Sequence, residues 1–571
     1  MRLWLGSNPL HHSLFAPVLL VAVILTVYYP AVFSGIHPID DPGILSLYSS
    51  SPPLSQILLP GSSYYYRPLV ELSFWLDNLL WGMEPSVMHL ESILLHCANS
   101  LLVFVLARKL SDTGKSNGLF PILAGLLFAL HPVHVEAVAW IAGRTDLLLA
   151  FFVLSSCYFL LRWLEAPRWQ ALAAALVLFG AALLSKETAL AFGAVIFLLL
   201  ITYPTPATVR QRICAVGLLA LPLICIMLYA LVLHRGNSGL SRFLTGGNVQ
   251  LWQGVQEACS AFGFYAKKLL LPLPLNFAIN EAHPVYGLAG VGLVPVLWWT
   301  IRRFRLAGVF FLATALVLMP AVLIAVKQVA WTLFAERYLY LPAAFFVLGL
   351  AVCAKKLAGT PKTVVLYATC GLLAAFAGIS LQRTMLWKDK PAFFEDAVKK
   401  SPGFGSVYYS MGGLLFQNGK IDQAAEAFAT ADRLNQRDSM RYVIKTGIMA
   451  TKIAQDDYHG TRNYFFEVFP QKKHATADFL ELLFKADNRR ISSLTGVEKT
   501  ILAEDLLETL DLLYQKRPDP FWLYQSGHCA LQAGDTSRAA VFFKRAYMTA
   551  PPDAHYRGAA EIMFLRLEGG T

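Results

Sequence analysis

Charged residues are scarce in this sequence: Asp, Glu, Lys and Arg together make up 15% of its 571 residues. Hydrophobic residues make up 56%, and the mean hydropathy is +0.50. A chain of this composition carries more apolar surface than soluble domains can bury, which excludes an ordinary soluble protein. The excess surface must face lipid, so we expect a multi-pass membrane protein.

Cysteine and glycosylation acceptors are also scarce. Cys259 and Cys529 are the only cysteines that could meet an oxidising compartment, so we expect no disulfide framework. The other six lie in or beside long apolar segments: Cys97, Cys157, Cys214, Cys225, Cys353 and Cys370. No Asn-x-Ser/Thr acceptor occurs in any loop, which is unusual for long segments that face an endoplasmic reticulum lumen. Its absence favours a bacterial inner membrane with a periplasmic outer side.

What is present is a series of apolar segments from Leu14 to about Leu381. Each is close to the roughly 17–25 residues that cross a bilayer as a helix. The first lacks a small-residue cleavage site and is long for a signal peptide, so we expect it to be retained. We predict eleven spans, near residues 14–33, 87–107, 119–135, 145–162, 170–184, 188–203, 213–233, 285–301, 306–325, 338–353 and 363–381.

Basic residues fall in alternate loops between these segments, which is the positive-inside pattern. An odd number of spans then places the N-terminus in the cytoplasm and the C-terminal domain outside. The clustering explains the net charge of +11 without a nucleic-acid partner. The residues are Arg108, Lys109 and Lys115; Arg162 and Arg168; Arg210 and Arg212; Arg302, Arg303 and Arg305; and Lys355, Lys356 and Lys362.

The C-terminal part is soluble in composition and contains an internal repeat. We expect a membrane domain over residues 1–383 and an external domain over residues 384–571. Its repeat has the small-residue, glycine-turn and aromatic pattern of a tetratricopeptide helix pair, with degenerate units between the two copies. A generic helical bundle is the alternative. The matching positions are Gly412, Gly419, Ala424, Phe428 and Ala431 in one copy and Gly527, Gly534, Ala539, Phe543 and Ala546 in the other.

An acidic pair follows the first span in the segment HPIDDPG, residues 37–43. Asp41 precedes Pro42, an arrangement that suits a helix N-cap. Asp40 is then left over near the membrane surface and is the better candidate for a general base. A purely structural role for both aspartates is the alternative.

Two further external clusters combine charge with aromatic rings or imidazoles. The segment YYYRPL, residues 64–69, places Arg67 among tyrosines that could equally anchor the chain at the interface. The segment HPVHVEAVAWIAGR, residues 131–144, contains four polar side chains: His131, His134, Glu136 and Arg144. The spacing of the histidines and the glutamate could supply divalent-metal ligands, but a hydrogen-bonded polar cap is more usual, so we predict no metal site.

A fourth cluster consists of two tight turns, SKET at residues 185–188 and AERYLYLP at residues 335–342. Each turn places a cation beside a carboxylate, Lys186 with Glu187 and Glu336 with Arg337, and these neighbours could be plain ion pairs. Together with the other clusters, they collect cations and carboxylates on one membrane face. Such a face suits a lipid phosphate held close to a base.

These motifs, in this order and followed by tetratricopeptide units, resemble the transmembrane and tetratricopeptide-repeat-containing O-mannosyltransferases and their bacterial relatives, of the GT-C superfamily. The resemblance implies an all-α, GT-C-like membrane domain of about eleven spans followed by a soluble α-helical repeat domain. It also implies transfer of a sugar from a polyprenyl-phosphate carrier to a hydroxyl of an external protein or glycan, assisted by Asp40 or Asp41.

Two other classes of function remain open at this stage. A non-enzymatic membrane-anchored scaffold would explain the repeats but not the charged motifs of the outer face. A transporter would explain the spans, but it would normally place ionisable groups near the middle of the membrane.

Overall fold

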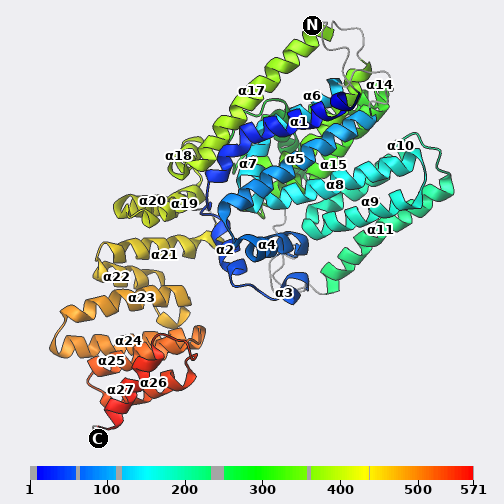
Figure 1. The fold of residues 1–571 in the computed structure, drawn as a ribbon. Coiled ribbons are helices and arrows are strands. Elements are labelled where there is room, and N and C mark those ends of the chain that lie inside the picture. Colours follow the sequence, from blue (N-terminus) through cyan, green and yellow to red (C-terminus); the bar gives the residue numbers. More distant parts are fainter. Residues whose placement is uncertain are drawn as a thin grey trace. The chain divides into compact units, whose positions relative to one another are not determined.

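The computed structural model describes residues 9–59, 65–110, 119–232, 250–356, 362–435 and 437–569. In this part of the chain the regular structure is helical, apart from a single isolated β-bridge between Ile279 and Phe334. The predicted all-α class is therefore confirmed. The chain forms two compact units, Met1–Ser401 and Pro402–Thr571, and Figure 1 labels their helices.

In the first unit, α5 is a central helix that packs against α1, α6, α8 and α16. Short 3-10 turns precede several helices: η1 (Tyr29–Phe33), η2 (Pro132–His134), η3 (Ile141–Gly143), η4 (Glu187–Ala189) and η5 (Glu336–Leu339). The α-helices are α1 (Pro9–Tyr28), α2 (Asp41–Ser49), α3 (Leu54–Leu58), α4 (Pro68–Trp81), α5 (Pro85–Leu110), α6 (Leu119–Leu130), α7 (Val135–Ala139), α8 (Arg144–Glu165), α9 (Trp169–Ser185), α10 (Leu190–Thr202), α11 (Val209–Val232), α13 (Leu251–Leu270), α14 (Tyr286–Arg303), α15 (Arg305–Lys327), α16 (Tyr340–Lys356), α17 (Lys362–Lys388) and α18 (Lys390–Lys400).

A helix occupies each of the eleven predicted spans, but their number is not confirmed. Among the described residues, five helices are long and apolar enough to cross a membrane, or six if one bent pair counts as a single span. Helices α9 and α10 are apolar but shorter. The chain is an integral membrane protein. The five helices are Phe15–Phe33, Pro85–Leu110, Ile141–Glu165, Arg305–Lys327 and Glu336–Ala354.

The bent pair is the segment from α6 to α7, where the helix axis turns by 47°. The break lies at His131, which is extended (φ −63°, ψ 123°) because it precedes Pro132. A second break follows at Trp140, and α8 begins after the turn η3. Gly143 is needed there, since a Cβ at this position would lie 2.5 Å from the carbonyl oxygen of Ala137.

The second unit is a stack of helix pairs, as the repeat predicted. Gly412 faces the ring of Phe428, and Gly527 faces the ring of Phe543, so closely that a Cβ would lie 2.9 Å and 2.6 Å from them. The turns at Gly419 and Gly534 have φ of +73° and +84°, which favours glycine. The helices are α19 (Gly405–Gln417), α20 (Ile421–Leu434), α21 (Asp438–Ala454), α22 (Tyr458–Val468), α23 (Ala477–Arg490), α24 (Gly496–Lys516), α25 (Pro520–Gln532), α26 (Thr536–Thr549) and α27 (Arg557–Glu568).

Candidate functional site

Three helices of the first unit, α8, α10 and α16, begin directly after a short 3-10 turn, and charged residues lie in each turn or directly after it. The residue before each turn is extended: Trp140 before η3, Lys186 before η4 and Ala335 before η5. An extended residue followed by a tight turn sends neighbouring side chains in different directions. The predicted cation and carboxylate motifs therefore reach partners that are distant in sequence.

The two aspartates differ in their surroundings. Asp41 is fully buried, and its carboxylate accepts hydrogen bonds from the backbone N–H groups of His37 (2.8 Å) and Ala142 (3.2 Å). Asp40 occupies the N-cap position of α2, is exposed, and makes no capping hydrogen bond with its side chain. The expectation that Asp41 caps α2 is therefore wrong, because its two oxygens are used by the preceding loop and by η3.

Burial sets the acidity of this pair. It raises the pKa of Asp41 to about 7, against the opposing effect of the two backbone N–H groups and of Lys390. Although the side chain of Asp40 reaches the surface, the surrounding packing raises its pKa as well, and the guanidinium of Arg337 opposes this shift. Asp40 is thus an accessible carboxylate with a cation nearby. Asp41 is an enclosed carboxylate that helps to shape the loop.

The raised pKa of Asp41 predicts a pH dependence of stability. The folded state holds the Asp41 proton more tightly than the unfolded state, so this stabilisation is complete below about pH 4 and is lost as the pH rises toward 7. At about 1.4 kcal/mol per pKa unit, the loss reaches a few kcal/mol. Between pH 4.5 and pH 8, we expect the melting temperature in detergent to fall further for the wild type than for Asp41→Asn.

Three other titratable or charged groups face Asp41, namely Asp40, Lys390 and His37, and both proteins retain them. The pH dependence that these groups contribute is therefore common to the two melting curves. Identical pH dependence in the wild type and in Asp41→Asn would contradict the shifted pKa.

Glu136 and Arg337 form the link between α7 and η5. The buried Glu136 carboxylate accepts the backbone N–H groups of Glu336 (2.9 Å) and Arg337 (3.2 Å), and it pairs with the Arg337 guanidinium. The guanidinium carbon lies 5.1 Å from the ring centre of Trp140 and 4.9 Å from that of Tyr338. Among the described residues, Glu136 is the guanidinium's one hydrogen-bond partner, so its remaining N–H groups can bind a ligand.

Lys186 and Glu187 do not pair with each other. Lys186 Nζ lies 2.7 Å from Asp146 Oδ1, and Glu187 forms two hydrogen bonds with Arg67, of 2.6 Å and 3.0 Å. The Arg67 guanidinium also lies 4.0 Å from the ring centre of Tyr65. Tyr64 of the same predicted motif lies outside the described residues. The ammonium of Lys186 also lies 5.7 Å from the ring centre of Tyr338.

Two residues that the sequence did not single out join these groups. Asp146 binds Lys186 and interacts electrostatically with Arg67 and Arg337. The ring of Tyr338 lies near both the ammonium of Lys186 and the guanidinium of Arg337. Asp146 lies two residues after the predicted motif that ends at Arg144, and Tyr338 lies within the predicted motif of residues 335–342. The joined set, which we call the phosphate-site candidates, is Arg67, Asp146, Lys186, Glu187, Arg337 and Glu136, with Asp40 beside Arg337.

Arg144 lies outside this set. Its side chain is 2% exposed and pairs with Asp77 at 2.6 Å and with Glu91 at 3.0 Å. It also donates to the Met88 carbonyl at 3.2 Å and to Ser73 Oγ at 3.4 Å. Arg144 thus holds α4, α5 and α8 together, and it would have to give up partners in order to bind a phosphate.

Glu336 and the two histidines are also engaged elsewhere. Glu336 pairs with Lys268 at 2.7 Å and accepts the backbone N–H of Asn276 at 2.9 Å. His131 Nε2 contacts the Leu269 carbonyl at 3.0 Å. His134 is buried among aromatic rings, and neither ring nitrogen has a hydrogen-bond partner among the residues that the structure describes. The described residues contain no group of three or more His, Cys, Asp or Glu side chains placed to hold a metal ion.

Comparisons with known proteins match a segment of the first unit that carries part of this site. Residues 67–230 match the family described as dolichyl-phosphate-mannose-protein mannosyltransferase. Protein O-mannosyl-transferase Tmtc1 of Drosophila melanogaster is 42% identical over 137 residues, which is 23% of this chain and 15% of the relative. Human protein O-mannosyl-transferase TMTC3 is 32% identical over 193 residues, 30% of this chain and 20% of the relative. The chain resembles the protein O-mannosyl-transferases.

The similarity to O-mannosyl-transferases confirms the resemblance seen in the motifs, and its extent is limited. It spans a fifth or less of the length of these relatives. The family match includes Arg67, Glu136 and Lys186 but not Asp40 or Arg337. The crystal structure of yeast Tom70 aligns with 82% of this chain and 96% of its own, at 10% identity and a TM-score of 0.21, values too low for the two folds to be compared in detail.

Proposed function

We propose that this chain is a glycosyltransferase that moves a sugar, with mannose the first candidate, from a polyprenyl-phosphate carrier to a hydroxyl of an external protein or glycan. The observation that carries the proposal is the exposed Asp40 carboxylate, which interacts electrostatically with the incompletely bonded guanidinium of Arg337. The similarity to protein O-mannosyl-transferases supports the sugar and the reaction class.

In the proposed reaction, Asp40 takes the proton of the acceptor hydroxyl while the oxygen attacks the anomeric carbon. The bond between this carbon and the phosphate oxygen breaks, and its electron pair leaves with the carrier phosphate. Arg337 then stabilises the negative charge that gathers on the phosphate. Attack from the face opposite the leaving group inverts the configuration.

Arg67 and Lys186 are additional phosphate ligands in this proposal. Both cations carry carboxylate partners, Glu187 and Asp146, which orient them toward the same region as Arg337. A phosphate that binds here would share these cations with the carboxylates. No metal ion or cofactor is part of the proposed reaction.

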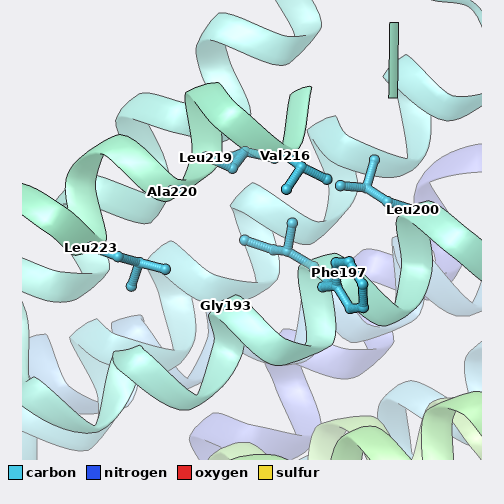
Figure 2. Close-up of a pocket in the computed structure, with 8 residues that line it drawn as sticks. Gly193, Phe197, Leu200, Val216, Leu219, Ala220 and Leu223 are labelled. Carbon is cyan, nitrogen blue, oxygen red and sulfur yellow. The ribbon is translucent and has the colours of Figure 1, made fainter. Parts of the chain in front are cut away.

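The carrier tail has an apolar path that begins close to these cations. A groove between α10 and α11 is lined by apolar residues (Figure 2). Helix α10 starts just after Lys186 and Glu187. Gly193 opens this groove opposite Leu223. We propose that the isoprenoid tail lies along it, so that the phosphate meets the charged end of α10. The residues that line the groove are Gly193, Ile196, Phe197, Leu200, Val216, Leu219, Ala220 and Leu223.

The proposal includes an orientation and a role for the repeats. From the alternate basic loops, we propose that the N-terminus lies in the cytoplasm and that the starts of α8, α10 and α16 lie on the outer side. We propose a bacterial inner membrane, with the repeat domain in the periplasm holding the acceptor. The starts of the three helices would then meet the donor at the outer membrane surface.

A membrane assay tests the function directly. Membranes containing the full chain are expected to release free polyprenyl phosphate from polyprenyl-phosphate mannose when external protein is present, with label transferred to that protein. Membranes that lack the chain are the control, and a non-enzymatic scaffold or a transporter predicts equal release in both. Equal release would therefore overturn the proposal.

A further inference from the structure

The loop that leads into Asp40 and Asp41 is held by a buried aromatic cluster. The ring of His37 is 3% exposed, and neither of its nitrogens has a hydrogen-bond partner within the described part of the chain. The backbone N–H of the same residue donates to Asp41 Oδ2 at 2.8 Å. The position of this ring therefore sets the position of the His37 backbone N–H group that donates to the Asp41 carboxylate. The rings around His37 belong to Trp140 (centroids 6.1 Å apart), Phe277 (5.7 Å), Trp387 (5.1 Å), Phe393 (4.9 Å) and Phe394 (5.7 Å).

Three of these rings come from one corner of the chain, the end of α17 and the start of α18. Phe393 is 1% exposed and lies 4.6 Å from Trp387 and 5.2 Å from Phe277, so it fills the centre of the cluster. Lys390 of the same corner interacts electrostatically with Asp41, and its Nζ lies against Gly35. The corner thus contacts the loop both through packing and through charge.

The same corner is fixed to the rest of the first unit by polar contacts. Asp396 of α18 pairs with Arg383 of α17 at 2.8 Å and with Lys400 at 2.6 Å. Lys400 Nζ also donates to the Leu275 carbonyl at 2.7 Å, and Asn276 Nδ2 donates to Ser401 Oγ at 2.8 Å. Ser401 is the last residue of the first unit, and the repeat domain follows at once. The segment that holds the loop is therefore the segment from which the repeat domain continues.

We propose that α18 is the positioning element of the Asp40–Asp41 loop, with Phe393 acting through His37 on the Asp41 carboxylate. This inference rests on the proposed function for its effect on catalysis, but not for the physical link. Phe393 is a positioning residue and touches no reacting atom. Its loss releases the loop, so that Asp40 no longer meets the acceptor at the right distance.

The test compares Phe393→Ala with Phe310→Ala in the full chain. Phe310 is a fully buried phenylalanine of α15 in the same unit, and no ring contact joins it to the loop, so it controls for the loss of a buried ring. We expect faster amide exchange over residues 34–45 in Phe393→Ala than in the control. Since small misplacements in active sites can cost about 100-fold in rate, we expect kcat to fall by about 10- to 100-fold. The donor KM should change little, and Phe393→Leu should recover most of the rate.

A milder variant covers the case in which Phe393→Ala does not fold. Asp396→Asn weakens the two ion pairs of α18 and leaves no cavity, and it should change loop exchange in the same direction. Unchanged exchange over residues 34–45 in both variants would overturn the inference, whatever happens to activity. Faster exchange with wild-type kcat would support the physical link and remove its catalytic role. If the wild type transfers no sugar, the proposed function fails, while the exchange comparison still decides the role of α18.

Discussion

Replacement of Asp40 with asparagine should lower the turnover number by about 10²–10⁴-fold, the usual contribution of a general base. The side chain is exposed and caps no helix, so its amide replacement should leave the melting temperature and donor binding nearly unchanged. The measurement is kcat with polyprenyl-phosphate mannose and an external acceptor, alongside thermal unfolding in detergent.

Asp41→Asn is the matched control, with the same substitution one residue away. Its carboxylate accepts two backbone N–H groups with two different oxygens, and an amide can accept only one of them. The other backbone N–H then faces the side-chain NH2 of asparagine and has no acceptor there. A buried donor without an acceptor costs about 1–3 kcal/mol of stability. We therefore expect a smaller loss of kcat than for Asp40→Asn and a larger loss of stability near pH 5. The reverse ranking of kcat would move the base to Asp41, and wild-type rates in both would remove this loop from the chemistry.

The helices could be located from the sequence because their signal is local. Apolar segments predicted the approximate position of a helix in each of the eleven spans, but not α2, α3, α4 or α13. The paired glycines and phenylalanines of the repeat predicted the packing of Gly412 on Phe428. The number of spans could not be fixed in this way. Helices such as α9, with 17 residues, are apolar but shorter than the roughly 20 residues that cross a bilayer, and composition alone does not decide whether they do so.

The site was less predictable because its contacts are long-range. The sequence identified Lys186, Glu187, Glu336 and Arg337 as charged neighbours, but each has a partner in another element. An extended residue before a 3-10 turn sends adjacent side chains in different directions. Composition and motif spacing do not predict this geometry. Asp146 was missed for the same reason, because its importance comes from Lys186, which lies 40 residues away.

The second large effect is expected at Arg337, where lysine should weaken donor binding by about 10- to 100-fold. The guanidinium is held by Glu136 and by the rings of Trp140 and Tyr338, and its remaining N–H groups can donate two hydrogen bonds to one phosphate. Lysine keeps the charge for Glu136 but offers a point charge and no planar stacking. A hydrogen bond to a charged group contributes about 1.5–3 kcal/mol, which corresponds to this loss of affinity.

Arg144→Lys is the matched control for this experiment. The substitution is identical, and Arg144 is an arginine of the same membrane unit that already has two carboxylate partners, Asp77 and Glu91. Lysine cannot make all four of its contacts, so this variant should lose several degrees of melting temperature. The affinity of its folded fraction for polyprenyl-phosphate mannose should remain close to that of the wild type.

The two variants together separate a phosphate ligand from a structural arginine. A phosphate ligand loses affinity at nearly constant melting temperature, whereas a structural arginine loses melting temperature first. Titration with polyprenyl-phosphate mannose and thermal unfolding, both in the same detergent, provide the two readouts. If both variants weaken binding to the same degree, the loss comes from general destabilisation and the role of Arg337 is wrong. If neither does, the phosphate is held by other cations, and Arg67 and Lys186 are the next residues to replace, because Asp146 and Glu187 already orient them toward the same region.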